Sequence, residues 1–194
     1  MDGFFFKTNK QKQKMIQAEQ IQEWKDKYGG AYKLPVDDKT AYLREPKMKD
    51  FKRAFAAMQN DGDIAFGEAL LNALFIGGDE EVKTVDDYFN PARKKLIKFF
   101  DYEDAEIERK KNQFIITIGD ARCTVRVVTR EDLKIAERKN PSGKVFVTQE
   151  KLFERILVSG DDVFNDRDNA DIRFPLYKAI EEIQNQKIAT LEKL

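Results

Sequence analysis

The sequence contains no histidine and a single cysteine, Cys123. Without histidine the chain lacks the commonest general base, the Ser–His and Cys–His nucleophile pairs and most zinc ligand sets. One cysteine cannot form a disulfide within the chain, so a reducing compartment is the simpler setting. Because Cys123 stands in an alternating apolar pattern, we expect it to be a buried strand residue. Neither a GxxxxGK[ST] nor a GxGxxG phosphate-binding motif occurs.

Long hydrophobic runs and an excess charge of either sign are also missing. No apolar stretch approaches the roughly 20 residues that span a bilayer, and the short run Phe4-Phe5-Phe6 is too brief for a signal peptide. The chain has 35 basic and 35 acidic residues, so neither half is basic enough to suggest nucleic acid. We therefore expect a soluble protein, cytoplasmic at synthesis, that binds no nucleic acid, membrane or cofactor.

The second half of the sequence resembles the first at an offset of 82 residues. The apolar register is the stronger evidence, because a slip of one residue would move a strand's apolar side chains to its other face. A duplicated small module suggests repeated contact with a partner, and a duplication without functional meaning remains the alternative. Identical residues are fewer, and they are Asp38/Asp120, Arg44/Arg126, Asp50/Asp132, Ala54/Ala136, Glu68/Glu150, Leu70/Leu152, Gly78/Gly160 and Asp79/Asp161.

The pattern predicts an α+β protein made of two tandem repeats, each a β-hairpin followed by about three helices, behind an N-terminal helix. Residues 1–30 form the arm and helix, 31–111 the first repeat and 112–194 the second. The helix covers residues 10–28 and ends at Gly29-Gly30. Pro35 cannot donate a ladder hydrogen bond, which indicates that the first strand has a free edge. An isolated hairpin is marginal in water, so both must pack on helices, on each other or on neighbouring subunits.

Helix boundaries follow from turn and capping signals. In the first repeat we expect helices over 47–59 and 64–75, and a last helix that starts near Thr84 or Asn90-Pro91 and runs to about Lys110. In the second repeat a capping box begins at Thr129, the second helix covers 149–158, and Phe174-Pro175 introduces the last helix.

Aromatic residues near the N-terminus are the candidate contact residues. Three consecutive exposed aromatics, Phe4, Phe5 and Phe6, would be an aggregation liability unless they dock. They either close over the protein's own core or insert into a partner groove. Trp24 and Tyr28 lie on the apolar stripe of the first helix, where the tryptophan acts either as a packing anchor or as part of the partner-binding surface.

Acidic clusters offer the one enzymatic alternative. A metal-dependent enzyme would rest on Asp79, Glu80, Asp161 and Asp166. The run from Asn165 to Asp171 looks superficially like a calcium loop, but it lacks the glycine and glutamate that such a loop needs at its sixth and twelfth positions. A solvated acidic loop explains it better, and no catalytic or metal-binding residue is predicted.

Three segments carry a resemblance. They are Glu23-Trp24-Lys25-Asp26-Lys27-Tyr28-Gly29-Gly30-Ala31-Tyr32-Lys33-Leu34, Ala41-Tyr42-Leu43-Arg44-Glu45-Pro46 and Glu68-Ala69-Leu70-Leu71-Asn72-Ala73-Leu74-Phe75-Ile76-Gly77-Gly78-Asp79-Glu80-Glu81. Together they resemble small tail-assembly-chaperone-like proteins encoded by phages of Bacteroidetes hosts. The order and spacing match over about residues 20–110. In the second repeat only Arg126 and Gly160-Asp161 persist, without the proline and the tryptophan-containing helix.

The resemblance implies a non-enzymatic phage morphogenesis protein that binds a tape-measure or other virion protein in the host cytoplasm. It carries over no catalytic residue. A structural virion component, such as a connector, ring or packaged internal protein that assembles with copies of itself through the repeats, is equally compatible with the residues.

Overall fold

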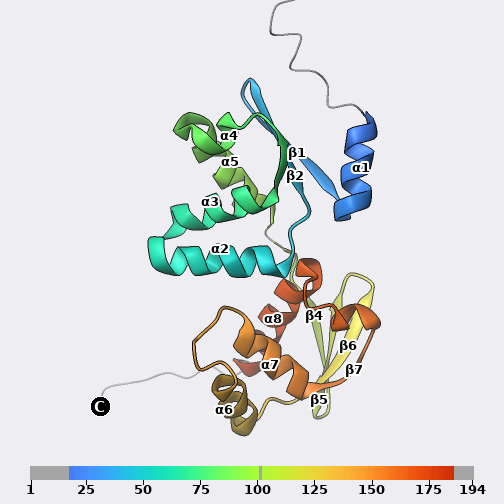
Figure 1. Cartoon of the computed structure of the whole chain (residues 1–194). Helices are drawn as coiled ribbons and strands as arrows, with labels where there is room; N and C mark the ends of the chain where they lie inside the picture. The colour runs from blue at the N-terminus through green and yellow to red at the C-terminus, as the bar shows by residue number, and fades with distance from the viewer. Residues whose placement is uncertain (1–17, 101, 186–194) are drawn as a thin grey trace, which may run out of the picture.

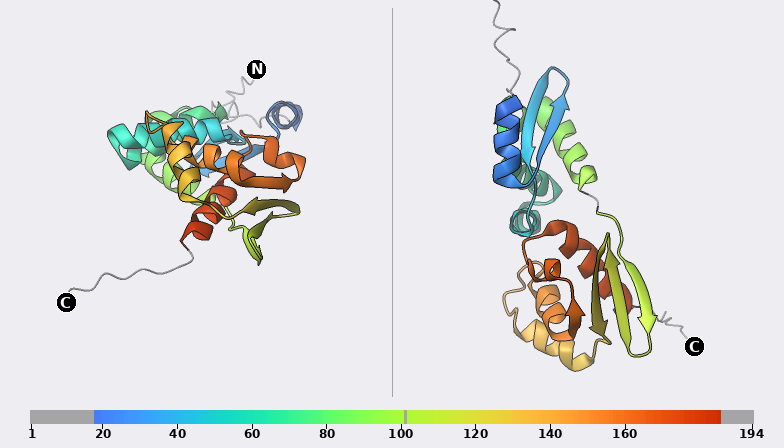
Figure 2. Two further views of the ribbon diagram at one scale, coloured as in Figure 1. Left: turned by 90° about the horizontal axis from the view of Figure 1, so that it is seen from below. Right: turned by 90° about the vertical axis from the view of Figure 1, so that its right-hand side faces the viewer.

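The computed structural model describes residues 18–100 and 102–185, which form an α+β fold with two antiparallel sheets. Figure 1 shows two stacked halves, each with its own sheet and its own helices, and Figure 2 shows them from below and from the side. The predicted fold class and the N-terminal helix are confirmed. Residues 1–9 of the predicted arm, and the beginning of the predicted helix, lie outside the described residues.

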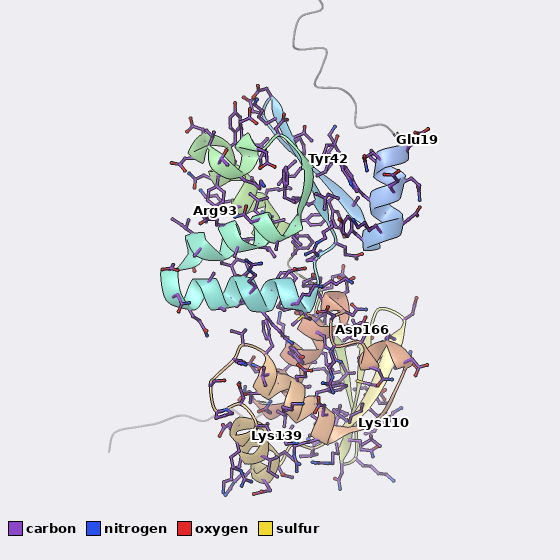
Figure 3. The ribbon with its side chains drawn as sticks, in the orientation of Figure 1. Glu19, Tyr42, Arg93, Lys110, Lys139 and Asp166 are labelled. Carbon is purple, nitrogen blue, oxygen red and sulfur yellow. The ribbon has the colours of Figure 1, made fainter. Side chains whose placement is uncertain are left out.

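The first half carries a three-stranded sheet in the order β1-β2-β3. Helices α2 and α3 pack against each other, and Gly67 makes room for α5, because a Cβ there would lie 2.9 Å from Cβ of Arg93 (Figure 3). The elements of this half are α1 (Ala18–Tyr28), β1 (Ala31–Val36), β2 (Lys39–Arg44), α2 (Met48–Asp61), α3 (Asp63–Leu74), β3 (Phe75–Gly78), α4 (Glu81–Thr84) and α5 (Asp86–Phe99).

The second half carries a four-stranded sheet in the order β4-β5-β6-β7. Helix α8 contacts β5, and α6 and α7 pack against each other. The elements are β4 (Glu106–Lys110), β5 (Gln113–Ile118), β6 (Ala121–Arg126), α6 (Arg130–Arg138), α7 (Val147–Ile156), β7 (Leu157–Gly160), the 3-10 helix η2 (Asp162–Asn165) and α8 (Ala170–Gln184).

Equivalent contacts recur in the two sheets at the offset of 82 residues. The β2–β3 ladder has a bulge after Tyr42, and the β6–β7 ladder has one after Thr124. Asp79 Oδ2 accepts a hydrogen bond from the Thr40 amide at 2.8 Å, and Asp161 Oδ2 accepts one from the Arg122 amide at 2.7 Å. These contacts support the proposed duplication, which as a statement about origin stays a prediction.

In each half one buried carboxylate ties the hairpin to the helix that follows it. Asp50 accepts hydrogen bonds from both terminal nitrogens of Arg44, each at 2.7 Å. Asp132 accepts the equivalent pair from Arg126 at 2.6 and 2.8 Å, and also a bond from Arg155. Paired, charge-assisted bonds of this geometry are the strong kind, so they fix the angle between strand and helix.

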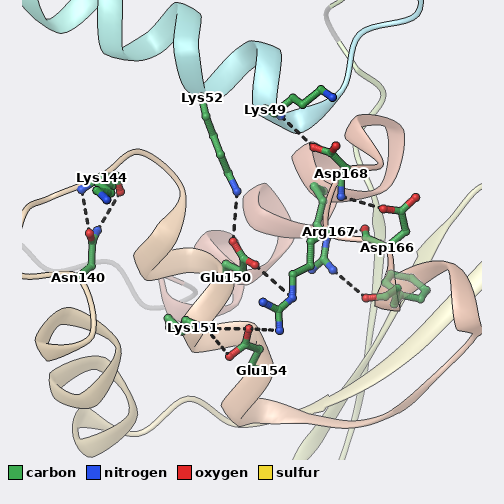
Figure 4. Close-up of polar contacts among 12 residues, drawn as sticks. Lys49, Lys52, Asn140, Lys144, Glu150, Lys151, Glu154, Asp166, Arg167 and Asp168 are labelled. Carbon is green, nitrogen blue, oxygen red and sulfur yellow. Dashed lines mark hydrogen bonds and ion pairs between the residues drawn. The ribbon is translucent and has the colours of Figure 1, made fainter. Parts of the chain in front are cut away.

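Aromatic rings join the halves. Phe51 of α2 lies edge-on to Phe174 of α8 with centroids 4.6 Å apart, and Phe55 lies 5.2 Å from Phe146. A polar contact also joins the halves: Lys52 Nζ of α2 lies 3.3 Å from Glu150 Oε2 of α7 (Figure 4). The halves therefore share a continuous core, and we expect them to unfold together.

The strands β3 and β7 were not predicted from the sequence. Residues 64–75 and 149–158 were expected to be continuous helices, but α3 ends at Leu74 and α7 at Ile156. The residues after each helix lie beside the unpaired edge of β2 or β6. Their backbone groups bond to that strand instead of forming the next helical turn. Gly78 has a φ of +106° and lies against the Thr40 carbonyl, where a Cβ would overlap the carbonyl oxygen. Only glycine occupies this position without strain.

The expected extent of the last helices was also wrong. Helix α5 ends at Phe99, and residues 106–110 form β4 instead of helix. Helix α5 begins at Asp86, close to the start expected at Thr84 rather than the one at Asn90-Pro91. Helix α8 begins at Ala170, before the expected Phe174-Pro175, so Pro91 and Pro175 both stand inside their helices. In α8 the start is set by Asn169, whose side chain accepts a bond from the Ile172 amide, a stronger signal than the proline.

The chain crosses from one sheet to the other before residue 106. Strand β4 pairs with β5 along its whole length, from Lys110 opposite Gln113 to Glu106 opposite Thr117. The turn between them, Lys111-Asn112, falls on the boundary predicted between the repeats. Residues 106–110 thus belong to the sheet of the second half.

Candidate protein-binding surface

The predicted contact residues of α1 lie on the outer face of the first sheet. The Trp24 ring lies 5.4 Å from the ring of Tyr42 on β2, which is labelled in Figure 3. It also covers β3, because a Cβ on Gly77 would come within 2.9 Å of Trp24 Cη2. Trp24 therefore anchors α1 to the sheet. Tyr28 is half-buried at the end of α1, and Phe4, Phe5 and Phe6 lie outside the described residues.

The edge strand β1 is the main structural difference between the two sheets. Strand β1 has one neighbour, β2, whereas its counterpart β5 lies between β6 and β4. The free edge that Pro35 predicted is thus confirmed for the described residues. An edge strand presents unpaired N–H and C=O groups, which makes it a template for another strand.

The phase of hydrogen bonding shows which residues of β1 face outward. The Glu45 amide donates to the Gly30 carbonyl at 3.3 Å, and the equivalent Val127 amide donates to the Asn112 carbonyl at 3.3 Å. Gly30 and Asn112 therefore direct their backbone groups toward β2 and β6. Because antiparallel ladders alternate, the outward-facing residues of β1 are Ala31, Lys33 and Pro35. Their counterparts on β5 are Gln113, Ile115 and Thr117, the residues paired with Lys110, Glu108 and Glu106 of β4.

A groove of about 560 Å³ runs along this edge between β1 and α5. Leu34, Pro35 and Val36 line it on the strand side. Residues from α5 line the other side, and they are Asp87, Tyr88, Pro91 and Lys95. The groove therefore presents a backbone edge and an apolar floor beside charged side chains, which suits an extended peptide more than a small substrate.

Both ends of the groove are held in place by side-chain contacts. At the hairpin tip the Tyr88 hydroxyl donates to Asp38 Oδ1 at 2.9 Å, and this bond raises the pKa of Tyr88. At the other end Tyr32 lies edge-on to Phe99, with centroids 5.2 Å apart. Phe99 is 55% exposed, so part of its ring remains open to a partner there.

A second hollow, of about 370 Å³, lies between the halves beside Tyr28. Glu45 and Asp171 line it, and burial raises the pKa of both carboxyls above the ordinary values. Asp168, also in the lining, accepts a hydrogen bond from the Lys49 amide at 3.1 Å (Figure 4). Asp168 thus joins the segment before α8 to the first turn of α2.

The four acids of the metal-enzyme alternative are not brought into one site. Asp79 and Asp161 each bond the backbone of their own sheet, in separate halves. Glu80 pairs with Lys83, and Asp166 accepts a bond from the Asp168 amide. Among residues 18–100 and 102–185, no group of three acids, cysteines or histidines is placed to hold a metal ion.

Sequence reasoning identified the edge but not the groove. Pro35 signalled that β1 lies at an edge, whereas nothing in the sequence placed Tyr88, Pro91 and Lys95 beside it. A proline at the sixth position of each last helix, Pro91 in α5 and Pro175 in α8, was the available hint that α5 corresponds to the helix lying against β5.

Comparison with known proteins finds no match: no family model fits the chain, and no curated protein or solved structure is significantly similar to it. None of the helices in the described part of the chain has the length and apolar character needed to cross a membrane.

Proposed function

We propose that this chain is a non-enzymatic phage morphogenesis protein, a tail-assembly chaperone that binds a tape-measure or other virion protein in the host cytoplasm. The observation that carries the binding role is the unpaired edge of β1 beside the α5 groove. This edge lies in the half that contains the resemblance to phage tail-assembly-chaperone-like proteins.

The residues of that resemblance support a binding scaffold more than a catalytic site. Trp24 and Gly77 seat α1 on the sheet, Arg44 holds the following helix through Asp50, and Asp79 bonds the turn of β2. Each of them stabilises the three-stranded sheet and leaves its β1 edge accessible. Such a motif fits a protein that presents a surface to a partner.

Affinity purification of the tagged chain from phage-infected cells tests this function. We expect a tape-measure or other virion protein to co-purify, and a variant with Asp120→Asn, in an exposed turn of the second half, to capture it equally. Recovery of the chain alone, at full expression and native fold, would contradict the proposal.

The alternative is a structural virion component, favoured by the second sheet. Its edge strand β7 carries Val158, an exposed apolar residue that can contact another copy, whereas the exposed charges of the other edge strand β4 disfavour pairing there. Mass spectrometry of purified particles distinguishes the two roles. A structural part is present at many copies per particle, whereas a chaperone is absent from the particle but abundant in infected cells.

A further inference from the structure

We propose that the edge of β1 binds an extended segment of a partner protein, added antiparallel to β1 in the position that β4 occupies on β5. The identity of the partner rests on the proposed function, but the binding mode rests on the structure. Strands β1-β2-β3 have the same order and register as β5-β6-β7, and among residues 18–100 and 102–185 only the second sheet has a strand outside this set, β4. Strand addition at an open sheet edge is a general mode of peptide recognition.

The backbone of β1 can form most of the ladder that β5 forms. Ala31 and Lys33 each offer an N–H and a C=O to the open edge, as Gln113 and Ile115 do to β4. Pro35 offers only its carbonyl, because proline has no N–H. The incoming strand therefore gains every equivalent bond except the one donated by Thr117 in the second sheet.

The side chains of β4 indicate which sequence fits this edge. In the register of β4 on β5, a segment on β1 would place the equivalent of Ile107 opposite Leu34 and of Glu108 opposite Lys33. The equivalent of Arg109 would meet the ring of Tyr32, as Arg109 lies over Phe114, 5.7 Å from its centroid. The partner segment is thus an extended peptide with an apolar residue followed by an acidic one.

A second copy of β1 fits this edge less well. In an antiparallel pair of β1 strands, the register that sets the three outward-facing residues 31, 33 and 35 opposite one another places Lys33 of one copy opposite Lys33 of the other. Like charges directly opposite are unfavourable. The two Pro35 residues also remove one donor from each side. Charge complementarity therefore favours a foreign acidic–apolar segment over a dimer through β1.

Amide hydrogen exchange, read residue by residue by NMR on the full chain, tests the mode. The probe is a synthetic peptide with the sequence of residues 104–110, which contains β4. In the free protein we expect fast exchange at the Ala31 and Lys33 amides and slow exchange at Tyr32 and Leu34, which bond to β2. Millimolar peptide should slow exchange at Ala31 and Lys33, while the amides of β5, already paired with β4, stay unchanged.

Matched variants identify the contacts. A peptide with Glu108→Lys should bind at least several-fold more weakly, and Lys33→Glu in the protein should restore its binding. Pro35→Thr supplies the donor that Thr117 provides in the second sheet, and should tighten binding of the original peptide roughly fivefold.

Three results would overturn the binding mode. They are unchanged exchange at Ala31 and Lys33, equal binding of the charge-reversed peptide, and protection of these amides that rises with protein concentration without peptide, which would indicate a dimer. The proposed function is tested separately, because capture of a virion protein that is insensitive to Lys33→Glu and Pro35→Thr would retain the function and reject this mode.

Discussion

Replacing Asp132 by asparagine should destabilise the protein more than the same change at Asp50. The two carboxylates hold equivalent places, and each accepts a bidentate pair from an arginine, at 2.7 Å for Asp50 and at 2.6 and 2.8 Å for Asp132. Asp50 accepts one further bond, from the Lys47 amide at 2.9 Å. Asp132 accepts three more, from the Thr129 amide and hydroxyl and from Arg155.

The magnitude follows from these bonds. A hydrogen bond to a charged group contributes about 1.5–3 kcal/mol, and breaking a buried ion pair costs about 3–5 kcal/mol. Asparagine keeps one oxygen and turns an amide toward the arginine. We expect a loss of about 2 kcal/mol for Asp50→Asn and about 4 kcal/mol for Asp132→Asn.

Urea unfolding followed by circular dichroism measures the difference, provided that the slope m is unchanged. Asp120→Asn is the control, because Asp120 is exposed in a turn and should shift stability by less than about 0.5 kcal/mol. In an Arg155→Ala background, the losses of unfolding free energy for Asp132→Asn and Asp50→Asn should become more alike. The first half has no equivalent arginine, because Ala73 stands at that place. Equal losses for Asp50→Asn and Asp132→Asn would refute the reasoning.

The acid range provides a second test of the same contact. The bonds from Arg126 hold the pKa of Asp132 well below its usual range. A carboxyl with a lowered pKa contributes its stability above its unfolded pKa, near 3.9, and loses it as the pH falls further. The difference between the wild type and Asp132→Asn should therefore shrink below about pH 4. A difference that stays constant down to the acid transition would contradict the assigned cause.

Three further outcomes are expected. Gly78→Ala should cost more stability in thermal unfolding than Gly160→Ala, since only Gly78 has a positive φ and a backbone carbonyl where its Cβ would lie; equal losses would contradict this. The Cys123 thiol, with burial raising its pKa to about 12, should resist alkylation at pH 8 until the protein unfolds, and rapid labelling of the native protein would oppose it. Glu45→Gln should raise the melting temperature at pH 7, with a gain in unfolding free energy of no more than about 1 kcal/mol. Burial, and then the charge of Asp171, raise the pKa of Glu45, so its charged form is disfavoured in the folded protein. A carboxyl whose pKa is raised by folding stabilises the protein at low pH, and this stability is lost as the pH rises through the raised pKa. The gain from Glu45→Gln should therefore vanish below about pH 4, where Glu45 is protonated. A gain that persists there would contradict burial of the charge as its cause.

Local patterns in the sequence were sufficient for the hairpins and most helices. Alternation around Asp37-Asp38 and Gly119-Asp120 predicted both hairpins, and the spacing of Thr129 and Asp132 predicted a capping box that the structure contains. These signals act between residues close in the chain, so they require no knowledge of the rest of the molecule. The 82-residue offset likewise needed only the sequence, and it led to the comparison of β1 with β5.

Features that depend on distant residues could not be predicted in this way. Strands β3 and β7 are four residues long, and their own residues are typical of helix ends. They form because β2 and β6 each have an unpaired edge beside them. Residues 106–110 became a strand because β5 offered an edge, although their charged composition suggested helix. Pairing partners lie up to about 40 residues away in these cases, and a propensity of a few tenths of a kcal/mol per residue does not outweigh a ladder.

The candidate site combines both kinds of information. By itself the sequence determined that β1 has an edge, because Pro35 cannot donate within a ladder, and that the chain has no histidine for common catalytic sites. Only the tertiary structure decided that this edge stays open in the first half while β4 covers its counterpart, and that α5 lines a groove beside it. The reason is physical: the missing N–H of proline is a property of one residue, whereas an open edge and a groove depend on which elements the core brings side by side.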